Sequence, residues 1–254
     1  MSEPGAGQPP QQPLQPAGDL YGGPPPPPPM PPGGAAVPPL PWEDRERRGF
    51  FPALIETVKL FVTSPSEAFA RAKERGDYLS PILFSVLIGW VATVIGQLWG
   101  LLFQGAWLSM LPPEMRDQFG PMMATGGASF ILTLILAPVL LLVWFFIWSG
   151  IVHLCLMMLG GHKQSGSGFE GTFRAVSYSY VSSLAQILPF VGGLIAFVWN
   201  LVLQVIGLVR MHRTSQGKAV GAVLLPILLC CLCVVAAFAL FFGAIMAAIG
   251  GNLD

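Results

Sequence analysis

The sequence predicts an all-α, polytopic membrane protein: a bundle of five transmembrane helices behind a disordered, proline-rich N-terminal tail. Three observations support this fold class. The 254 residues are 53% hydrophobic and only 10% charged, whereas soluble domains usually carry about 25% charged residues. Long apolar runs separated by short polar loops recur from Pro81 onward. Lys and Arg gather in alternate loops, as the topology of membrane proteins requires.

The first segment, residues 1–42, is predicted to be a disordered tail. It holds 16 of the 25 prolines, and such a composition cannot bury enough apolar surface to offset the entropy of ordering. A narrower alternative is that Pro38–Trp42 docks as a polyproline helix into an aromatic groove of another protein. No apolar stretch follows a basic start, so we expect no cleavable signal peptide, and the first apolar run would act as a signal anchor.

Residues 43–78 are predicted to form two short, basic amphipathic helices beside the membrane. In the first, six apolar residues share one helical face: Phe51, Leu54, Ile55, Val58, Phe61 and Val62. The second opens on Ser64-Pro65-Ser66-Glu67, a capping pattern with proline at the first helical position, and leads to Arg71, Lys73 and Arg75. A basic helix pair rich in phenylalanine favours the membrane interface. Packing on cytosolic loops of the same chain is the alternative.

The membrane domain is predicted over residues 79–254, with spans at about 81–108, 129–159, 173–191, 193–209 and 219–249. A bilayer core needs about 20 helical residues, so the first, second and fifth runs are ample and the fourth is at the short limit. The third is doubtful on hydropathy alone because it holds four serines and Gln186. A shallow hairpin formed by the third and fourth runs is the alternative.

The positive charges favour five spans. With five spans and a cytoplasmic N-terminus, 12 of the 13 Lys and Arg residues fall on the cytoplasmic side, and only Arg116 lies outside. If the third run did not cross, the cations of the loop after the fourth run, Arg210, Arg213 and Lys218, would be external. Five spans place the C-terminus outside.

The residues give no indication of catalysis, a metal site or a cofactor. All 13 acidic residues lie outside the predicted spans, whereas ion-coupled transporters keep ionisable groups at mid-membrane. His153 is the only ionisable side chain well inside a span, and a neutral histidine bonded to a neighbouring helix is favoured over a functional base. Gly166–Gly171 matches the dinucleotide fingerprint by letter but lacks the required strand and sheet context. We therefore expect no enzyme and no cofactor, and the zero net charge argues against a nucleic-acid partner.

Small and polar residues inside the spans are predicted to hold the helices together. Gly96 and Gly100 form a GxxxG pair, and Asn200 and Gln204 lie one turn apart, where they can bond a partner helix. His153 belongs to the same class of polar core residues. Each such contact contributes on the order of 1 kcal/mol in lipid.

Several stretches occur in a fixed order along the chain: Ser64–Phe69 with Tyr78–Pro81, Gly171–Ser179, Ile187–Gly193, and Gln204–Leu208 with His212, Gly217 and Lys218. Over residues 64–229 they resemble, in order and spacing, the bacterial branch of the Yip family, the Ypt/Rab-interacting membrane proteins. The resemblance implies a five-span bundle with a cytosolic N-terminus, and the motifs favour a bacterial plasma (inner) membrane. Eukaryotic members take part in vesicle trafficking and contact Rab-type GTPases, an activity we do not transfer; many bacterial members have no known activity.

Two classes of function are left open. The favoured one is a non-enzymatic, membrane-organising scaffold or adaptor, and the other is a small transporter or permeation pathway built around His153, Asn200 and Gln204. The partners we expect are the lipid bilayer, a protein bound at the cytosolic face, and a second copy of the chain. The cytosolic face is predicted to be basic, with Arg71, Lys73, Arg75, Lys163, Arg174, Arg210, Arg213 and Lys218.

Overall fold

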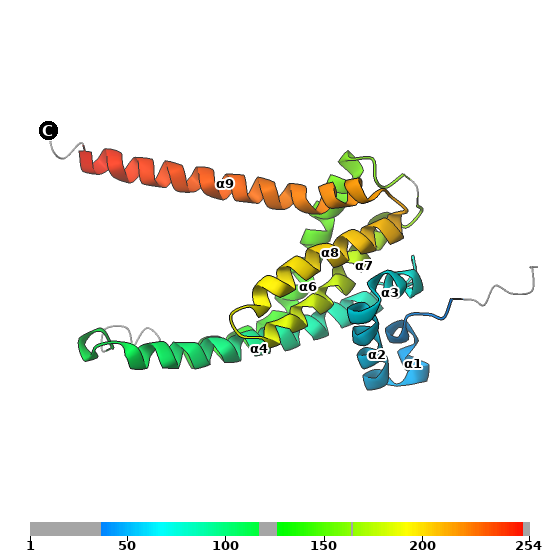
Figure 1. The fold of residues 1–254 in the computed structure, drawn as a ribbon, viewed down its shortest axis with the longest axis horizontal. Coiled ribbons are helices and arrows are strands. Elements are labelled where there is room, and N and C mark those ends of the chain that lie inside the picture. The colour runs from blue at the N-terminus through cyan, green and yellow to red at the C-terminus, as the bar shows by residue number, and fades with distance from the viewer. Residues whose placement is uncertain (1–36, 117–125, 164, 251–254) are drawn as a thin grey trace, which may run out of the picture. The chain divides into compact units, whose positions relative to one another are not determined.

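The computed structural model describes residues 37–116, 126–163 and 165–250, and every regular element that it describes is a helix (Figure 1). This confirms the all-α class. The predicted disorder of residues 1–36 lies outside the described residues. In chain order the elements are η1 (Pro41–Asp44), α1 (Arg45–Arg48), α2 (Phe50–Thr63), α3 (Pro65–Arg71), α4 (Leu79–Met110), α6 (Gly126–Met158), α7 (Gly168–Ser179), η2 (Tyr180–Ile187), α8 (Gly192–His212) and α9 (Gln216–Gly250).

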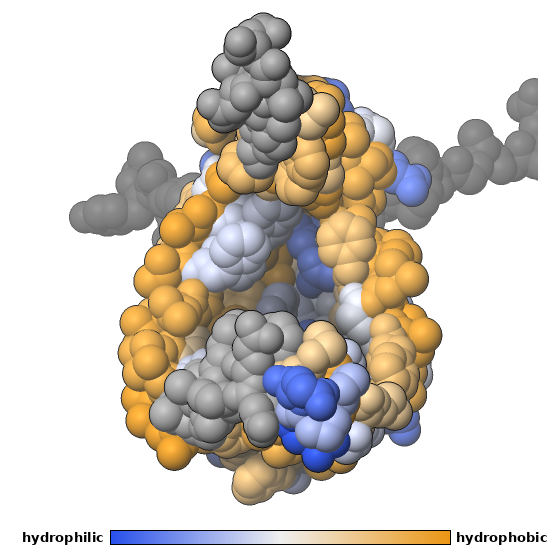
Figure 2. Space-filling model, turned by 90° about the vertical axis from the view of Figure 1, so that its left-hand side faces the viewer, coloured by the Kyte–Doolittle hydropathy of each residue, from blue (hydrophilic) through white to orange (hydrophobic). Residues whose placement is uncertain are grey.

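Four helices are long and apolar enough to cross a membrane: Leu79–Met110, Phe130–Met158, Gly192–His212 and Gln216–Gly243. They correspond to the first, second, fourth and fifth predicted runs. Large apolar side chains are exposed along these helices, and Figure 2 shows them as extensive hydrophobic surface. Such a surface suits contact with lipid tails.

The third predicted span takes a different form and is not among those four helices. It consists of the twelve-residue helix α7, continued without a break by η2, a 3-10 helix of eight residues. Every residue from Gly171 to Ser179 is buried, because α4, α6 and α8 pack around the segment. Its low hydropathy therefore reflects protein neighbours. The five-span count is not established by helix length and composition.

The structure differs from the predicted tail at its C-terminal end, because residues 37–42 belong to the fold. Leu40 and Trp42 are fully buried. The Trp42 indole N–H donates to the Ser80 carbonyl at 2.8 Å, and its backbone N–H donates to Thr57 Oγ1 at 2.8 Å. Docking of Pro38–Trp42 into another protein is therefore contradicted, since its large side chains are already buried in this chain.

Helix α2 divides its apolar residues between two stripes. Ala53 and Phe61 are buried against the bundle, whereas Phe51 and Ile55 are 70% and 65% exposed. The helix therefore packs on the same chain along one stripe. Contact of the other stripe with the membrane interface stays a prediction.

An aromatic cluster joins the juxtamembrane helices to the bundle. The Phe61 ring of α2 lies 5.0 Å from Phe69 of α3 and stacks at 5.6 Å on Tyr178 of α7, and Phe84 of α4 lies 5.3 Å from Tyr178. Each such aromatic pair adds about 0.5–1.5 kcal/mol beyond its area burial. The cluster holds α2 and α3 beside the polar network described next.

Candidate functional site

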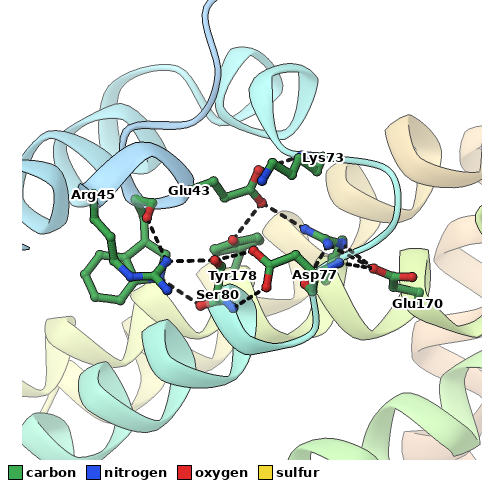
Figure 3. A network of polar contacts seen from close by, with 9 residues as sticks. Glu43, Arg45, Lys73, Asp77, Ser80, Glu170 and Tyr178 are labelled. Atoms are coloured by element: carbon green, nitrogen blue, oxygen red, sulfur yellow. Dashed lines mark hydrogen bonds and ion pairs between the residues drawn. The ribbon is translucent and has the colours of Figure 1, made fainter. Parts of the chain in front are cut away.

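The main polar feature of the fold surrounds Arg174 on α7 (Figure 3). Its side chain is fully buried. One guanidinium nitrogen, Nη1, bonds Glu43 at 2.9 Å; the other, Nη2, bonds Glu170 at 2.9 Å and the Asp77 carbonyl oxygen at 2.6 Å. One buried cation thus ties η1 and the segment before α4 to α7. We call these four residues, with Tyr178, the Arg174 network.

Glu43 is the fully buried anion of this network. Its carboxylate accepts hydrogen bonds from the Tyr178 hydroxyl at 2.8 Å, the backbone N–H of Lys73 at 2.8 Å, and Arg174. Burial raises the pKa of the Glu43 carboxyl, and the three donors oppose that shift. A carboxylate removed from water survives in the folded chain only with such partners.

Asp77 anchors the start of α4. Its carboxylate accepts hydrogen bonds from the backbone N–H of Ser80 at 3.0 Å and from the Ser80 hydroxyl. Burial opposes the shift, but these bonds and the charge of Arg174 lower the pKa of Asp77. Arg45 extends the connection to α1, because it donates to Ser80 Oγ at 2.7 Å and lies 5.2 Å from the Trp42 ring centroid.

Arg174 therefore does not lie where the sequence analysis put it. We expected an exposed cation on the cytosolic face, but the side chain points into the interior, where Glu43 and Glu170 neutralise it. The Glu170–Arg174 spacing of four residues was a visible helical ion-pair signal. Glu43 lies 131 residues away in sequence, so no local pattern indicates that contact.

Six of the other predicted face cations are exposed, and Arg71 is half-buried; the six are Lys73, Arg75, Lys163, Arg210, Arg213 and Lys218. Three contacts join the segments that carry them. Arg213 pairs with Glu74 at 2.9 Å, and Lys218 Nζ donates to the Gly160 carbonyl at 3.2 Å. The Arg75 guanidinium lies against Gly166, 2.9 Å from where a Cβ would be. We call these six cations the basic face.

His153 is bonded to a neighbouring helix. Its Nδ1 lies 2.8 Å from Thr172 Oγ1 on α7, and the same hydroxyl lies 2.8 Å from His212 Nε2 at the end of α8. The sequence analysis missed His212 as a partner, because the two histidines meet only through Thr172. The Thr172 hydroxyl of α7 thus links α6 to the end of α8.

Asn200 and Gln204 bond one another and two partner helices. Gln204 Nε2 donates to Asn200 Oδ1, and the Asn200 amide donates to the Ser179 carbonyl at 3.0 Å. The Trp148 indole of α6 donates to Gln204 Oε1 at 3.1 Å. Both amides also line a cavity of about 510 Å³ between α6, η2, α8 and α9.

Of the predicted GxxxG pair, Gly96 lies close to a neighbouring segment and Gly100 does not. A Cβ on Gly96 would lie 3.3 Å from Gln186 Oε1, whereas a Cβ on Gly100 would have no atom within 4 Å. A closer approach on α4 occurs seven residues before Gly96, at Gly89, where a Cβ would lie 3.0 Å from both Leu141 and Tyr180. The spacing alone does not tell which glycines meet a helix.

The model of the Yip1 domain family matches residues 58–238. The chain belongs to the Yip1 domain family. With its apolar helices, this makes the chain an integral membrane protein. No curated protein and no solved structure matches the chain.

The Yip1 domain match begins within α2, but the folded unit begins earlier. Leu40, Trp42 and Glu43 precede the matched residues and are all buried against them. The Arg174 network therefore joins a preceding segment to the Yip1 domain. Chemically, the network holds charges in place rather than presenting them to a substrate.

Proposed function

We propose that this Yip1 domain protein is a non-enzymatic, membrane-organising scaffold or adaptor whose cytosolic basic face binds a protein partner. One observation carries the proposal. Segments 71–75, 160–172 and 210–218, which are far apart in sequence, meet through the contacts of Arg75, Arg213 and Lys218. An interaction surface needs this kind of convergence on a fixed support.

The charge of the basic face indicates the kind of partner. Among the described residues, Arg213 is the only one of its six cations with an acidic partner within ion-pair distance. Cations left without acids attract an acidic surface and speed its encounter, more than they add to final affinity. We therefore propose a partner protein with an acidic patch.

The Arg174 network helps to fix the position of the 160–172 segment, which carries part of the basic face. Glu170 accepts a hydrogen bond from the Asp77 backbone N–H at 3.1 Å and pairs with Arg174 at 2.9 Å. The Ser167 hydroxyl donates to the Met211 carbonyl at 2.8 Å. These bonds tie the 160–172 loop to α4 and α8, so the partner would meet a surface that is already ordered.

We further propose that α7 and η2 together form a fifth span, packed against α4, α6 and α8. Twelve α-helical and eight 3-10 residues extend about 34 Å, which suits a hydrocarbon core of about 30 Å. The segment also lies beside α4 and runs in the same direction. Contacts progress along both: Arg174 with Asp77, Tyr180 with Gly89, Gln186 with Gly96, and Phe190 with Phe103.

Five spans in a bacterial plasma membrane, with a cytoplasmic N-terminus, would place Asp254 outside. A reporter that is active only outside the cytoplasm, fused after Asp254, should then be active. The same reporter inserted at Lys163, in a loop proposed to be cytoplasmic, should be silent. Cytoplasmic activity of the Asp254 fusion would rule out an odd number of spans.

Photo-crosslinking in living cells tests the partner. A photoreactive residue at Lys163 or Arg210 should give a discrete protein adduct, whereas one at Lys59 should not. Lys59 is an exposed cation of α2 outside the basic face. The double variant Lys163→Glu/Arg210→Glu should lose the adduct, and Lys59→Glu should keep it. Equal adducts from all three positions would contradict a defined face.

A permeation pathway is the second candidate, and one observation favours it: Asn200 and Gln204 both line the cavity. His153, the third residue expected on such a pathway, is bonded to Thr172 instead and is not among the described lining residues. Solute flux through purified protein in liposomes, lost on His153→Ala, would establish this candidate. Protein adducts without flux would exclude it.

A further inference from the structure

The residues that line the cavity between α6, η2, α8 and α9 determine which kind of molecule it can hold. Its described lining holds no charged side chain. Aromatic rings form much of the wall, and polar, small and aliphatic residues form the rest. The rings are those of Trp144, Phe145, Trp148, Tyr180 and Phe197, and the polar residues include Ser182, Ser183 and Gln186. Volumes of about 300–1,000 Å³ with mostly apolar walls and a few polar groups are typical of small-molecule sites.

The position of the cavity places it in the bilayer core. Asn200 lies about 12 Å along α8 from Gly192, and Cys230 lies about 21 Å along α9 from Gln216. Figure 2, viewed from the side where α4 and α9 end, shows a hollow bordered by hydrophobic surface with less hydrophobic residues inside. A molecule entering at this depth would come from the lipid tails.

Among the described lining residues, Ser183 is the one with a fully buried polar atom that has no protein partner. Ser183 is 3% exposed, and its hydroxyl has no hydrogen-bond partner among the described residues. Leaving such a group unpaired in a dry interior costs free energy. The oxygen of the neighbouring Ser182 hydroxyl accepts from the Asn200 amide at 3.2 Å, and its O–H has no acceptor among the described residues.

The amides of the cavity narrow the choice of ligand group. Both hydrogens of Asn200 Nδ2 have acceptors, Ser179 O and Ser182 Oγ. Gln204 Nε2 carries two hydrogens, and Asn200 Oδ1 is its one acceptor among the described residues. The free donors of the described lining thus include the hydroxyls of Ser182, Ser183 and Tyr180 and one amide N–H of Gln204. The complementary ligand group is an uncharged acceptor such as a carbonyl oxygen.

We propose that this cavity binds a neutral amphiphile from the bilayer, whose carbonyl oxygen accepts a hydrogen bond from Ser183 while its hydrocarbon lies against the aromatic wall. A charged headgroup would lose its hydration here without meeting a counter-charge, so anionic phospholipids are excluded. The inference is independent of the basic face, since none of its cations lines the cavity.

Photolabelling of the full chain in phosphatidylcholine nanodiscs tests the proposal. The probe is a diacylglycerol with a diazirine on one acyl chain, compared with a phosphatidylglycerol that carries the same chain. The diacylglycerol should label cavity-lining residues of α8 and α9, and excess unlabelled diacylglycerol should compete. Absence of labelling there, or equal labelling by the phosphatidylglycerol without competition, would overturn the proposal.

Matched variants distinguish binding in the cavity from labelling of the lipid-facing surface in general. Ser183→Ala should lower labelling about 2- to 12-fold, the factor conferred by one hydrogen bond. Ser149→Ala, which also removes a buried, unpartnered hydroxyl but one outside the cavity lining, should leave labelling unchanged. Equal effects of the two would overturn the role of Ser183.

A second pair of variants tests the cavity by adding a side chain instead of removing a hydrogen bond. A Cβ on Gly193, which lines the cavity, meets no atom within 4 Å, and the same is true of Gly100 on α4. Gly193→Leu should abolish labelling and Gly100→Leu should not. Labelling that survives Gly193→Leu would overturn the proposal. A Cys230–Cys230 disulfide between two copies, found without lipid labelling, would also overturn it, because a second chain would then occupy the cavity.

Discussion

The segment α7–η2 and the helix α9 differ in what surrounds them. In α7, nine consecutive residues are buried, and they include an arginine and two serines. In α9, the most apolar window is only 6% buried within the protein. Hydropathy thus reports the surroundings of a helix: lipid around α9, other helices around α7–η2. A helix enclosed by protein can satisfy polar side chains that lipid could not.

The difference implies that the two regions respond differently to substitution. Interactions within α7–η2 are specific and dense, so losing one leaves a buried group unpaired. Side chains on the outer surface of α9 exchange one apolar neighbour for another. The four predictions below test this contrast by thermal unfolding of the purified chain in detergent, in order of expected effect.

The largest effect is expected for Arg174→Ala. Removing this cation leaves the buried carboxylate of Glu43 without its ion-pair partner, and breaking a buried pair costs about 3–5 kcal/mol. Leu232→Ala on α9, where the side chain is 66% exposed, should stay within about 0.5 kcal/mol of the native chain. Similar losses for both would remove the contrast between the regions.

Tyr178→Phe should cost about 1.5–3 kcal/mol, because the buried Glu43 carboxylate loses one of its three hydrogen-bond donors. The control is Tyr180→Phe in η2, whose hydroxyl has no bond partner among the described residues, and it should change stability by less than about 0.5 kcal/mol. The unfolding midpoints of the two variants give the comparison directly. A cost for Tyr180→Phe as large as that for Tyr178→Phe would show that the Glu43 bond is not the cause.

Gly207→Ala should cost about 1–3 kcal/mol through overpacking. A Cβ there would lie 2.9 Å from both the Ala175 Cβ of α7 and the Phe69 ring of α3. The same change at Gly243 of α9, where no atom lies within 4 Å of the new Cβ, should be neutral or stabilise the helix by up to about 1 kcal/mol. If Gly207→Ala also stabilised the chain, α8 would not pack closely on α7.

The smallest effect concerns pH and Glu43. Because the folded-state pKa of Glu43 is raised above its ordinary value of 4.5, the folded chain holds this proton more tightly than the unfolded chain. Its contribution to stability is complete below about pH 4.5 and is lost as pH rises through the raised pKa. The stability of the native chain relative to Glu43→Gln should therefore increase as pH falls from 7 to 5.

Unfolding midpoints of both chains at the two pH values measure this difference. The lowered pKa of Asp77 lies below 3.8, so that carboxyl does not titrate within this range. Groups common to both chains cancel in the comparison. A difference that shrinks on acidification would show that Glu43 is held as a stabilised anion.

The four long apolar helices were predictable because a helix that faces lipid has a long apolar run in its sequence. The first was expected at about 81–108 and is Leu79–Met110; the last was expected at about 219–249 and is Gln216–Gly250. The exact form of the third run was not predictable, since its serines are buried by helices that are distant in sequence. The burial of Leu40 and Trp42 was not predictable, because the proline-rich composition around them is typical of a disordered tail.

The polar site was predictable only in part. Asn200 and Gln204 could be found because they share one face of an apolar helix, and their partners Ser179 and Trp148 could not. Arg174 was found as a cation but placed on the surface, because the contact with Glu43 spans 131 residues. Pairings of this range depend on the fold, and charge counting cannot reveal them.

Because Glu43 is buried against Arg174, the short segment before the Yip1 domain match is part of the same folding unit as the domain. A chain shortened to residues 58–238 would keep Arg174 and Glu170 but lose Glu43, the fully buried one of the two carboxylates that neutralise the cation. The boundary of homology and the boundary of the folding unit thus differ. The acid and the cation should therefore be inherited together: relatives lacking an acid at the position of Glu43 should also lack the arginine.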